Sequence, residues 1–243
     1  MEKNILIIGA NSDIVKELIK IFINNNYHLY LLTRDKIKLK NYLENLIIKK
    51  NYNIIEFDPK NYIDLPTILD SLKPVPTTSI IANGYMGDKS DLSENPANIK
   101  KIIDINFTYS AIISEMILNI YKKKNNSAGN LIVLSSIAGE RGRAKNYIYG
   151  SAKSGITNYF SGLRQKYNST NIIITTIILG FVKTKMTLND DMSPFLTSTP
   201  KKIAKSIYKS IIKKNDIYFP LIWRIIGLII KFLPEKIFKK LKF

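Results

Sequence analysis

The sequence predicts an α/β protein built on one doubly wound, parallel sheet of seven strands. Three observations lead to this fold class. Seven short apolar runs recur along the chain, and the segments between them have the length and apolar spacing of helices. The runs are nearly continuous in apolar residues rather than alternating, which is typical of parallel strands covered on both faces. Strands that alternate with helices favour a doubly wound sheet with right-handed crossovers.

The expected strands follow one another at regular intervals along the chain. They cover residues 4–9, 28–33, 53–57, 78–83, 130–136, 171–179 and 216–220. The first segment between strands, SDIVKELIKIFINN, has its apolar residues at helical spacing. We see no internal repeat and no low-complexity linker before the end of the chain, so we expect one domain over residues 1–220 and a basic, amphipathic tail over 221–243.

Composition limits the possible chemistry. The chain has 243 residues, of which 45% are hydrophobic, and this is ample for a folded core. It has no cysteine, which excludes disulfides and thiolate sites. His28 is the only histidine and stands at the start of an expected strand, so we expect no metal site. The first residues, MEKNILIIGANS, read as a first buried strand rather than a signal peptide.

The chain is strongly basic, and the excess charge is concentrated at its end. The formal net charge is +18, and residues 201–243 hold twelve Lys or Arg against two acidic residues, which gives +10. Such a balance indicates nucleic acid or an anionic membrane surface as a partner. The cations are interleaved with aliphatic residues rather than with a recognition motif, so we expect no nucleic-acid partner.

The first candidate site is the loop GANSDIV after the first strand. In a doubly wound sheet, ligands bind outside the carboxyl ends of the strands. A glycine at this turn lets a phosphate approach the N–H groups at a helix N-terminus, where Ser12 or Asp13 is expected to act as the cap. A strand–turn–helix connection without a ligand explains the loop about as well. The candidate cofactor contacts here are Gly9, Asn11, Ser12, Asp13 and Ile14.

The second strand ends in LLTRD, which bears on the choice of cofactor. NAD-binding folds often place an acidic residue here for the ribose 2′-OH. Thr33 stands at that position and Arg34 follows it. Because a guanidinium matches a phosphate with two hydrogen bonds, this pair favours NADP(H) over NAD(H). The alternative is a solvated arginine whose charge is reduced by Asp35.

Polar residues and a glycine also follow the third and fourth strands. Asp58 stands where a carboxylate accepts a hydrogen bond from an adenine amino group. Asn83 and Gly84, in IANGYMGD, are placed at the turn beneath the cofactor. We expect all three to contact the dinucleotide.

The stretch NYIYGSAKSG holds the most specific signal. In a helix, Tyr149 and Lys153 lie one turn apart on one face, a spacing that gives Tyr147 no charged partner. Ser136 ends the fifth strand, thirteen residues before Tyr149, and Asn106 falls in the preceding helix. This order of Asn, Ser and Tyr-x-x-x-Lys resembles the catalytic pattern of the short-chain dehydrogenase/reductase family.

The resemblance implies a Rossmann fold, a nicotinamide cofactor and an enzyme that interconverts ketones and alcohols. Tyr149 is then the proton donor, and Lys153 lowers the pKa of Tyr149 and holds the nicotinamide ribose. Ser136 donates to the substrate oxygen, and Asn106 orders a water behind the lysine. A free tyrosine has a pKa of ~10, which is too high for an efficient acid at neutral pH, so a neighbouring cation such as the Lys153 ammonium is needed.

Two further segments can be set beside the family pattern: one resembles it and the other departs from it. LGFVKTKM resembles the family's Pro-Gly-x-x-x-Thr segment, with Leu179 in place of the proline. It implies that Thr184 holds the nicotinamide carboxamide. The phosphate loop departs from the family, because an acid and a valine replace its second and third glycines. The cofactor contacts added by this comparison are Gly180, Val182 and Thr184, together with Tyr149 and Lys153.

A finer resemblance concerns the substrate. GANSDIV, with its acid at position 13, and GYMGD at 84–88 resemble the decaprenylphosphoryl-2-keto-ribose reductases. That group pairs with a flavin oxidase to epimerise a lipid-linked pentose. The resemblance implies a keto group on a lipid-linked sugar or another amphipathic ketone, and a flavin oxidase as a possible partner.

The tail PLIWRIIGLIIKFLPEKIFKKLKF has the composition of a helix that lies in a membrane interface. It is short for a membrane span, is interrupted by Arg224 and Lys231, and is stopped by Pro234. We expect a cytoplasmic protein that contacts an anionic membrane peripherally, on its inner face. We also expect a homo-oligomer. The alternatives for the tail are a helix at the oligomer interface, which would suit a soluble 3-oxoacyl or ketosteroid-type reductase, and a hairpin-like insertion. A non-catalytic dinucleotide sensor is the rival of another class.

Overall fold

The computed structural model confirms the seven-stranded parallel sheet. It describes residues 3–46, 51–87, 95–124, 128–187 and 193–241. All neighbouring strands pair in parallel, in the order β3-β2-β1-β4-β5-β6-β7. The strands are β1 (Asn4–Ile8), β2 (His28–Thr33), β3 (Tyr52–Glu56), β4 (Thr78–Ile81), β5 (Ala128–Ser136), β6 (Asn171–Leu179) and β7 (Ile217–Tyr218). They differ from the expected strands by at most a few residues at each end.

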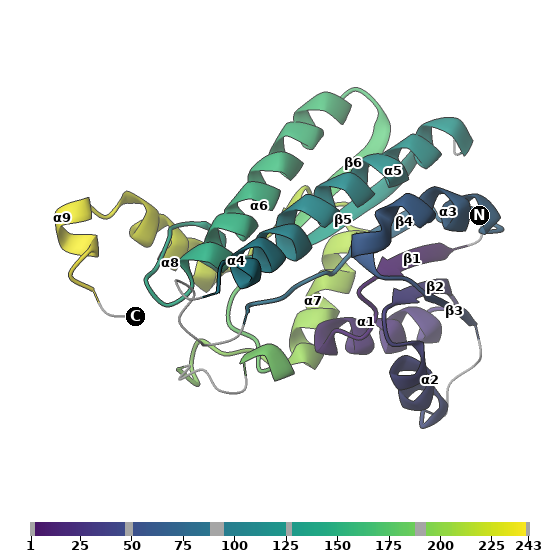
Figure 1. Ribbon diagram of the computed structural model, residues 1–243, viewed down its shortest axis with the longest axis horizontal. Helices are drawn as coiled ribbons and strands as arrows, with labels where there is room; N and C mark the ends of the chain where they lie inside the picture. Colours follow the sequence, from purple (N-terminus) through teal and green to yellow (C-terminus); the bar gives the residue numbers. More distant parts are fainter. Residues whose placement is uncertain (1–2, 47–50, 88–94, 125–127, 188–192, 242–243) are drawn as a thin grey trace.

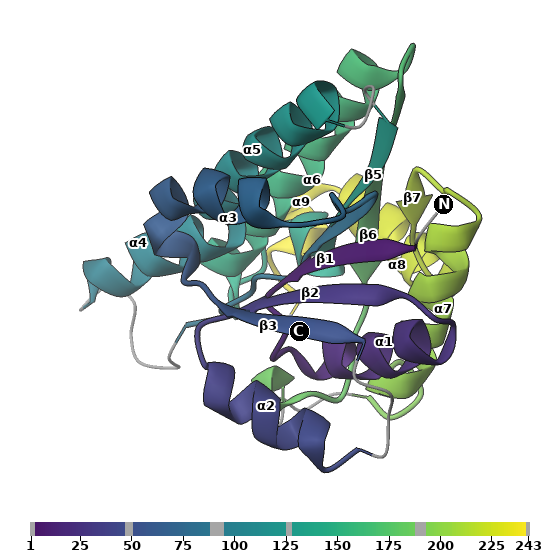
Figure 2. The same ribbon diagram turned by 90° about the vertical axis from the view of Figure 1, so that its right-hand side faces the viewer.

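Helices cover both faces of the sheet, as Figures 1 and 2 show. One face carries α1 (Asp13–Asn24), α2 (Lys36–Glu44) and α7 (Pro200–Ile212). The other carries α3 (Leu65–Ser71), α4 (Pro96–Ile103), α5 (Tyr109–Lys124) and α6 (Tyr147–Tyr167). A π-helical turn, η2 (Asp104–Thr108), joins α4 to α5, and the short turns are η1 (Pro59–Asp64), η3 (Ile137–Gly139) and η4 (Lys185–Thr187).

The sheet is buried on both faces, which explains the continuous apolar runs in the sequence. In β1, Ile5 and Ile7 pack toward α1 and α7, while Leu6 and Ile8 pack toward α5 and α6. All four residues are fully buried. A strand that meets helices on both sides has no solvent-facing positions, so its sequence has no alternation.

The strand order reverses between β1 and β4, and this fixes where a ligand binds. The chain runs outward from β1 to β3, returns to β4 beside β1, and continues outward to β7. The crossovers that leave β1 and β4 therefore go to opposite sides and open a crevice at the carboxyl ends of these strands. His28 lies at the opposite, amino edge, where its ring nitrogens contact the side-chain oxygens of Asn51 and Asn53 at 2.9 and 2.7 Å.

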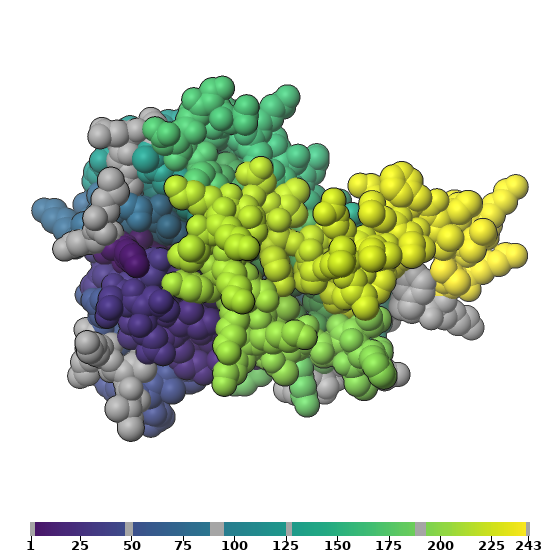
Figure 3. All heavy atoms as spheres, turned by 180° about the vertical axis from the view of Figure 1, so that it is seen from behind, coloured from purple at the N-terminus to yellow at the C-terminus, as the bar shows by residue number. Residues whose placement is uncertain are grey.

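The C-terminal segment forms a projection at one end of the molecule, coloured yellow in Figures 1 and 3. It contains α8 (Leu221–Phe232) and α9 (Glu235–Phe238). Within the described ranges, no helix combines the length and the apolar character that crossing a membrane requires. Asp88 of the GYMGD motif and Lys242 of the tail lie outside the described residues.

Candidate active site

The loops at the carboxyl ends of β1, β4, β5 and β6 hold most of the predicted site residues. Gly9 turns the chain at the end of β1 with φ of 87°, a left-handed conformation that glycine adopts without strain. A Cβ on Gly9 would lie 2.9 Å from the carbonyl carbon of Ala82, just after β4. Glycine therefore allows the loops after β1 and β4 to approach more closely than a residue with a side chain would permit.

Ser136 and Tyr149 are brought together by the packing of η3 against α6. Ser136 ends β5, Tyr149 lies in the first turn of α6, and Ser136 is close enough to the phenol to lower its pKa. Two glycines permit this contact. A Cβ on Gly150 would lie 2.6 Å from a carbonyl oxygen of η3, and a Cβ on Gly139 would lie 2.8 Å from the carbonyl carbon of Lys153. The turn after Ser136 thus rests directly on the backbone of α6.

Lys153 is buried beneath Tyr149, with 4% of its surface exposed. Its Nζ donates to the carbonyl oxygens of Leu134 at 3.0 Å and Asn83 at 3.4 Å. The same Nζ lies 5.7 Å from the centre of the Tyr149 ring. The amine is therefore held between the ends of β4 and β5, on the same edge of the sheet as Gly9.

Burial shifts the pKa values of this pair in opposite directions. Burial raises the pKa of Tyr149 to about 12, and the hydrogen bond with Ser136 lowers it in part. Burial also lowers the pKa of Lys153 to about 8. Removal from water is the largest influence on the phenol, so the pKa of Tyr149 rises rather than falls. The expected effect of Lys153 and of an oxidised nicotinamide on this phenol stays a prediction.

Asn106 lies in the π-helical turn η2 and is almost fully buried. Its Nδ2 donates to the carbonyl oxygens of Tyr85 at 2.6 Å and Ile102 at 2.8 Å, and its Oδ1 accepts from the N–H of Tyr85 at 3.3 Å. The side chain thereby fixes the loop that contains Gly84, next to the carbonyl that Lys153 contacts. A π-helical turn at this point is typical of functional sites.

Two buried amide groups point to a polar ligand at this edge. Asn11 Nδ2 donates to Thr33 Oγ1 at 2.6 Å and to the carbonyl oxygen of Asp35 at 2.8 Å. Asn11 Oδ1 and Asn83 Nδ2 are buried and have no hydrogen-bond partner among the described residues. Because a buried polar group is normally satisfied, these atoms and the Gly9 turn fit a dinucleotide laid along the crevice.

The helix start after Gly9 departs from the expected capping. Ser12 occupies the N-cap position of α1, but its side chain makes no capping hydrogen bond. Asp13 instead accepts from the N–H of Lys185 at 2.7 Å, which ties α1 to the η4 turn 172 residues later. Ile14 is 6% exposed and packs in the core, so only its backbone is available to a cofactor.

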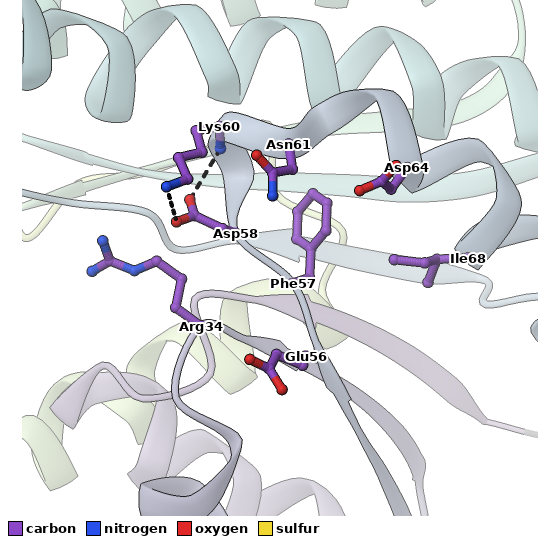
Figure 4. Close-up of a pocket in the computed structure, with 8 residues that line it drawn as sticks. All are labelled: Arg34, Glu56, Phe57, Asp58, Lys60, Asn61, Asp64 and Ile68. Atoms are coloured by element: carbon purple, nitrogen blue, oxygen red, sulfur yellow. Dashed lines mark hydrogen bonds and ion pairs between the residues drawn. The ribbon is translucent and has the colours of Figure 1, made fainter.

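A pocket of about 300 Å³ lies where β2 and β3 end, and Figure 4 shows it. Arg34 and Lys60 extend their cationic ends to the same side of this pocket. Asp58 accepts from the N–H of Lys60 at 3.1 Å and pairs with its Nζ at 3.8 Å, so this carboxylate is partly engaged. Asp35 caps α2 by accepting from the N–H of Lys38 at 2.8 Å.

The segment after β6 holds three predicted cofactor contacts, and each lies in different surroundings. Val182 is 5% exposed and belongs to the core, so its side chain does not face the crevice. Thr184 Oγ1 lies 3.3 Å from Thr187 Oγ1, whose hydroxyl also contacts the N–H of Thr184 at 3.1 Å. Gly180 lies against Trp223 of the tail, since a Cβ on Gly180 would be 1.9 Å from the indole Nε1.

Three residues of the site were not predicted from the sequence. Ser135 Oγ donates to the carbonyl oxygen of Lys153 at 3.1 Å and lies 2.6 Å from Thr157 Oγ1, which ties α6 to β5. Lys60 joins Arg34 in the pocket where β2 and β3 end. The spacing of Thr157, four residues after Lys153, is a signal that it shares a helix face with the lysine.

The fold and the site define a doubly wound α/β protein with a Ser–Tyr–Lys cluster at the carboxyl edge of its sheet. The sequence profile of the short chain dehydrogenase family matches residues 3–193. The chain therefore belongs to the short-chain dehydrogenase/reductase family.

Relatives in sequence cover about two thirds of the chain. An uncharacterised oxidoreductase of Mycobacterium tuberculosis is 28% identical over 165 residues, which are 68% of this chain and 65% of the relative. Ketoacyl reductase HetN of a Nostoc species is 26% identical over 168 residues, which are 66% of this chain and 58% of the relative. The chain thus spans less than two thirds of the length of either relative.

Solved structures share the fold. A short chain dehydrogenase from Burkholderia cenocepacia in complex with NADP has a TM-score of 0.82 at 13% identity, covering 100% of this chain and 98% of that chain. A 4-hydroxyisoleucine dehydrogenase mutant complexed with NADH and succinate has a TM-score of 0.78 at 22% identity, covering 89% and 96%. ElxO with NADP bound has a TM-score of 0.75 at 21% identity, covering 86% and 91%.

Proposed function

We propose that this protein is an NAD(P)H-dependent carbonyl/alcohol oxidoreductase of the short-chain type. One observation carries the proposal: the Tyr149 phenol lies close enough to Ser136 for the serine to lower its pKa, with the buried Lys153 Nζ 5.7 Å from the ring centre, at the edge where Gly9 turns. Membership of the family supports the same reaction class. The structural neighbours that hold NADP or NADH support a nicotinamide dinucleotide as cofactor.

The ionisation of the site suits reduction of a ketone. A bound nicotinamide dinucleotide supplies the hydride. With a pKa of about 12 the phenol is protonated at neutral pH but is a weak acid. It donates its proton to the carbonyl oxygen, as that atom becomes an alkoxide, with the help of the neighbouring lysine charge. Ser136 orients the phenol and donates to the same oxygen. Lys153, with a pKa of about 8, is mostly charged at neutral pH and stabilises the phenolate that remains.

We infer that the cofactor is NADP(H) rather than NAD(H). Thr33 is buried and its hydroxyl accepts from Asn11, so the position that would hold an acid for the ribose 2′-OH carries a neutral group. Arg34 and Lys60 supply two cations at the adjoining pocket. Two cations without a carboxylate at the Thr33 position favour a 2′-phosphate over a hydroxyl.

We infer further that the substrate is amphipathic, such as a keto sugar on a lipid carrier. The resemblance of GANSDIV and GYMGD to 2-keto-ribose reductases supports this class, and so does the apolar, basic tail. We also infer that the protein lies peripherally on the cytoplasmic face of an anionic membrane, with residues 221–243 as a tail on a reductase domain of residues 1–220. A flavin oxidase would then be its partner in the reaction sequence.

A soluble 3-oxoacyl or ketosteroid-type reductase is the second candidate. The relative named as a ketoacyl reductase favours it, and the tail would then form a contact in a homo-oligomer. Flotation of the protein with liposomes separates the two candidates. A protein that stays in the aqueous fraction and forms an oligomer through its tail supports the soluble enzyme.

The reductase proposal is tested by NADPH oxidation over a panel of lipid-linked and soluble ketones. The wild-type protein is expected to oxidise NADPH with at least one ketone, while Tyr149→Phe binds NADPH with unchanged affinity and does not oxidise it. Binding without turnover on every ketone, in the wild type as well, would instead support a non-catalytic dinucleotide sensor.

A further inference from the structure

Helix α8 of the tail is packed against the active site rather than free of it. The Trp223 indole fills the space above Gly180, where a Cβ would lie 1.9 Å from its Nε1. Trp223 is 5% exposed and meets the Phe181 ring edge-on at 4.7 Å. Gly180 directly follows Leu179, which pairs with Ser136 across β5 and β6. The indole therefore contacts the residue that directly follows β6, and the last residue of β6 pairs with Ser136.

A second contact joins α8 to the turn that follows Ser136. A Cβ on Gly227 would lie 2.9 Å from Ile137 Cδ1 and 3.5 Å from Glu140 Cγ. Trp223 and Gly227 are four residues apart, so they share one face of the helix. This inner face of α8, defined by Trp223 and Gly227, thus touches both loops that leave β5 and β6 at the site.

Arg141 fixes the far end of α8. One guanidinium nitrogen donates to the carbonyl oxygens of Ile230, at 2.7 Å, and Leu233. The other pairs with Glu235 at 2.5 Å, and the guanidinium lies over the Phe238 ring at 3.8 Å. Because Arg141 belongs to the segment between Ser136 and Tyr149, the loop that carries the catalytic serine also holds the tail in place.

The opposite side of α8 is apolar and exposed. At 100° per residue, the six exposed apolar side chains of α8 named at the end of this paragraph fall on the side of the helix away from Trp223. Arg224 and Lys231 are exposed at the border between the two sides, and Lys236, Lys239 and Lys240 follow. We define the outer face by its exposed apolar residues, each at least half exposed: Leu221, Ile222, Ile225, Leu228, Ile229 and Phe232.

The charges around the outer face favour an anionic bilayer over a second copy of the chain. Residues 221–241 hold five Lys or Arg and one acid, Glu235, which is paired with Arg141. A two-fold contact would place these cations against themselves. An apolar stripe bordered by cations that reach toward headgroups is the pattern of a helix lying in an anionic interface.

We propose that α8 places the mouth of the active site on an anionic bilayer, so that the ketone reaches Tyr149 from the lipid side. The inner face forms a wall of the substrate site beside Ser136, and the outer face enters the headgroup boundary. The inference rests on the proposed reductase function for the identity of the reaction. The lipid contact itself does not depend on that function.

The binding step is tested with full-length protein and vesicles. Ile225→Glu combined with Leu228→Glu changes two outer-face residues that are 51% and 50% exposed, so the core is untouched. The matched control is Ile212→Glu combined with Ile217→Glu, two residues of the reductase domain that are 52% and 49% exposed and give the same charge change. Wild type and control should bind vesicles of phosphatidylglycerol and phosphatidylcholine, and the outer-face variant should bind at least about ten-fold more weakly.

The catalytic step is tested with two forms of one ketone. On a short, water-soluble ketone, kcat and KM of the outer-face variant should equal those of the wild type, which also shows that it is folded. On a long-chain analogue held in anionic vesicles, the variant should lose about ten-fold or more in rate, while the control keeps the wild-type rate.

Three results would overturn the inference. The first is wild-type protein that does not bind anionic vesicles. The second is an outer-face variant that binds them as the wild type does. The third is a variant that dissociates an oligomer by light scattering, which would assign the outer face to a second copy. A protein that binds vesicles through α8 but reduces no ketone leaves the lipid contact standing and rejects the reductase function instead.

Discussion

Tyr149 and Lys153 are single residues whose ionisation is set by where the fold places them. Removal from water disfavours the charged form of each group, so the phenol holds its proton more tightly and the ammonium less tightly. At neutral pH this leaves a protonated tyrosine beside a mostly charged lysine. That combination is the one a proton donor requires before its proton is transferred.

The buried lysine should make stability depend on pH. Its pKa falls from 10.5 in the unfolded chain to about 8 in the folded one, so between these values the unfolded chain binds more protons. Wild-type stability therefore rises with pH in this window, and Lys153→Met lacks the effect. Urea unfolding should show the wild type gaining about 2 kcal/mol relative to Lys153→Met between about pH 7 and about pH 10. A constant difference would mean that the amine is solvated.

Arg34 should decide between the two cofactors. If its guanidinium contacts a 2′-phosphate, Arg34→Met should raise the KM for NADPH about ten- to a hundred-fold and leave the KM for NADH nearly unchanged. Lys209→Met, an exposed substitution on α7, is the control for the loss of one positive charge. Equal losses for both cofactors in steady-state assays would remove Arg34 from phosphate recognition.

Among the elements, α1 is joined to η4 by Asp13, the residue that stands in place of the second glycine of the family pattern. Asp13 accepts from the N–H of Lys185, next to Thr184, and so holds the loop after β6 against the phosphate loop. Asp13→Ala should release this loop and speed the dissociation of NADPH, while Asp13→Asn keeps an acceptor and should have a smaller effect. Stopped-flow fluorescence of bound NADPH measures both rates. Identical rates in the two variants and the wild type would contradict a role for the contact.

The elements that were predictable from the sequence are those set by local pattern. The continuous apolar runs gave all seven strands, and the helical spacing of Tyr149 and Lys153 gave their shared face. The packing of Trp223 on Gly180 was not predictable, because the room for an indole depends on how helix α8 meets a loop 43 residues earlier in the chain. The pKa of Tyr149 was also missed, because a spacing of residues does not reveal how deeply the hydroxyl is buried.

At the scale of the whole molecule, charge and apolar surface are distributed unequally. Residues 201–243 carry +10 of the net +18. The exposed apolar residues of α8 lie in the same segment, in the projection at one end of the molecule (Figure 3). The reactive end of the sheet faces this projection through Gly180 and Ile137. One end of the molecule therefore combines the candidate catalytic groups with the surface that we assign to lipid.

A single-turnover comparison of two tyrosines shows whether the phenol of Tyr149 delivers the proton. Tyr147 lies two residues earlier in the same helix and is 51% exposed, so Tyr147→Phe is a matched control. With NADPH prebound and a saturating ketone, Tyr149→Phe should slow the oxidation of NADPH by about a hundred-fold or more, while Tyr147→Phe keeps the wild-type rate. Equal rates for wild type and Tyr149→Phe would contradict the account.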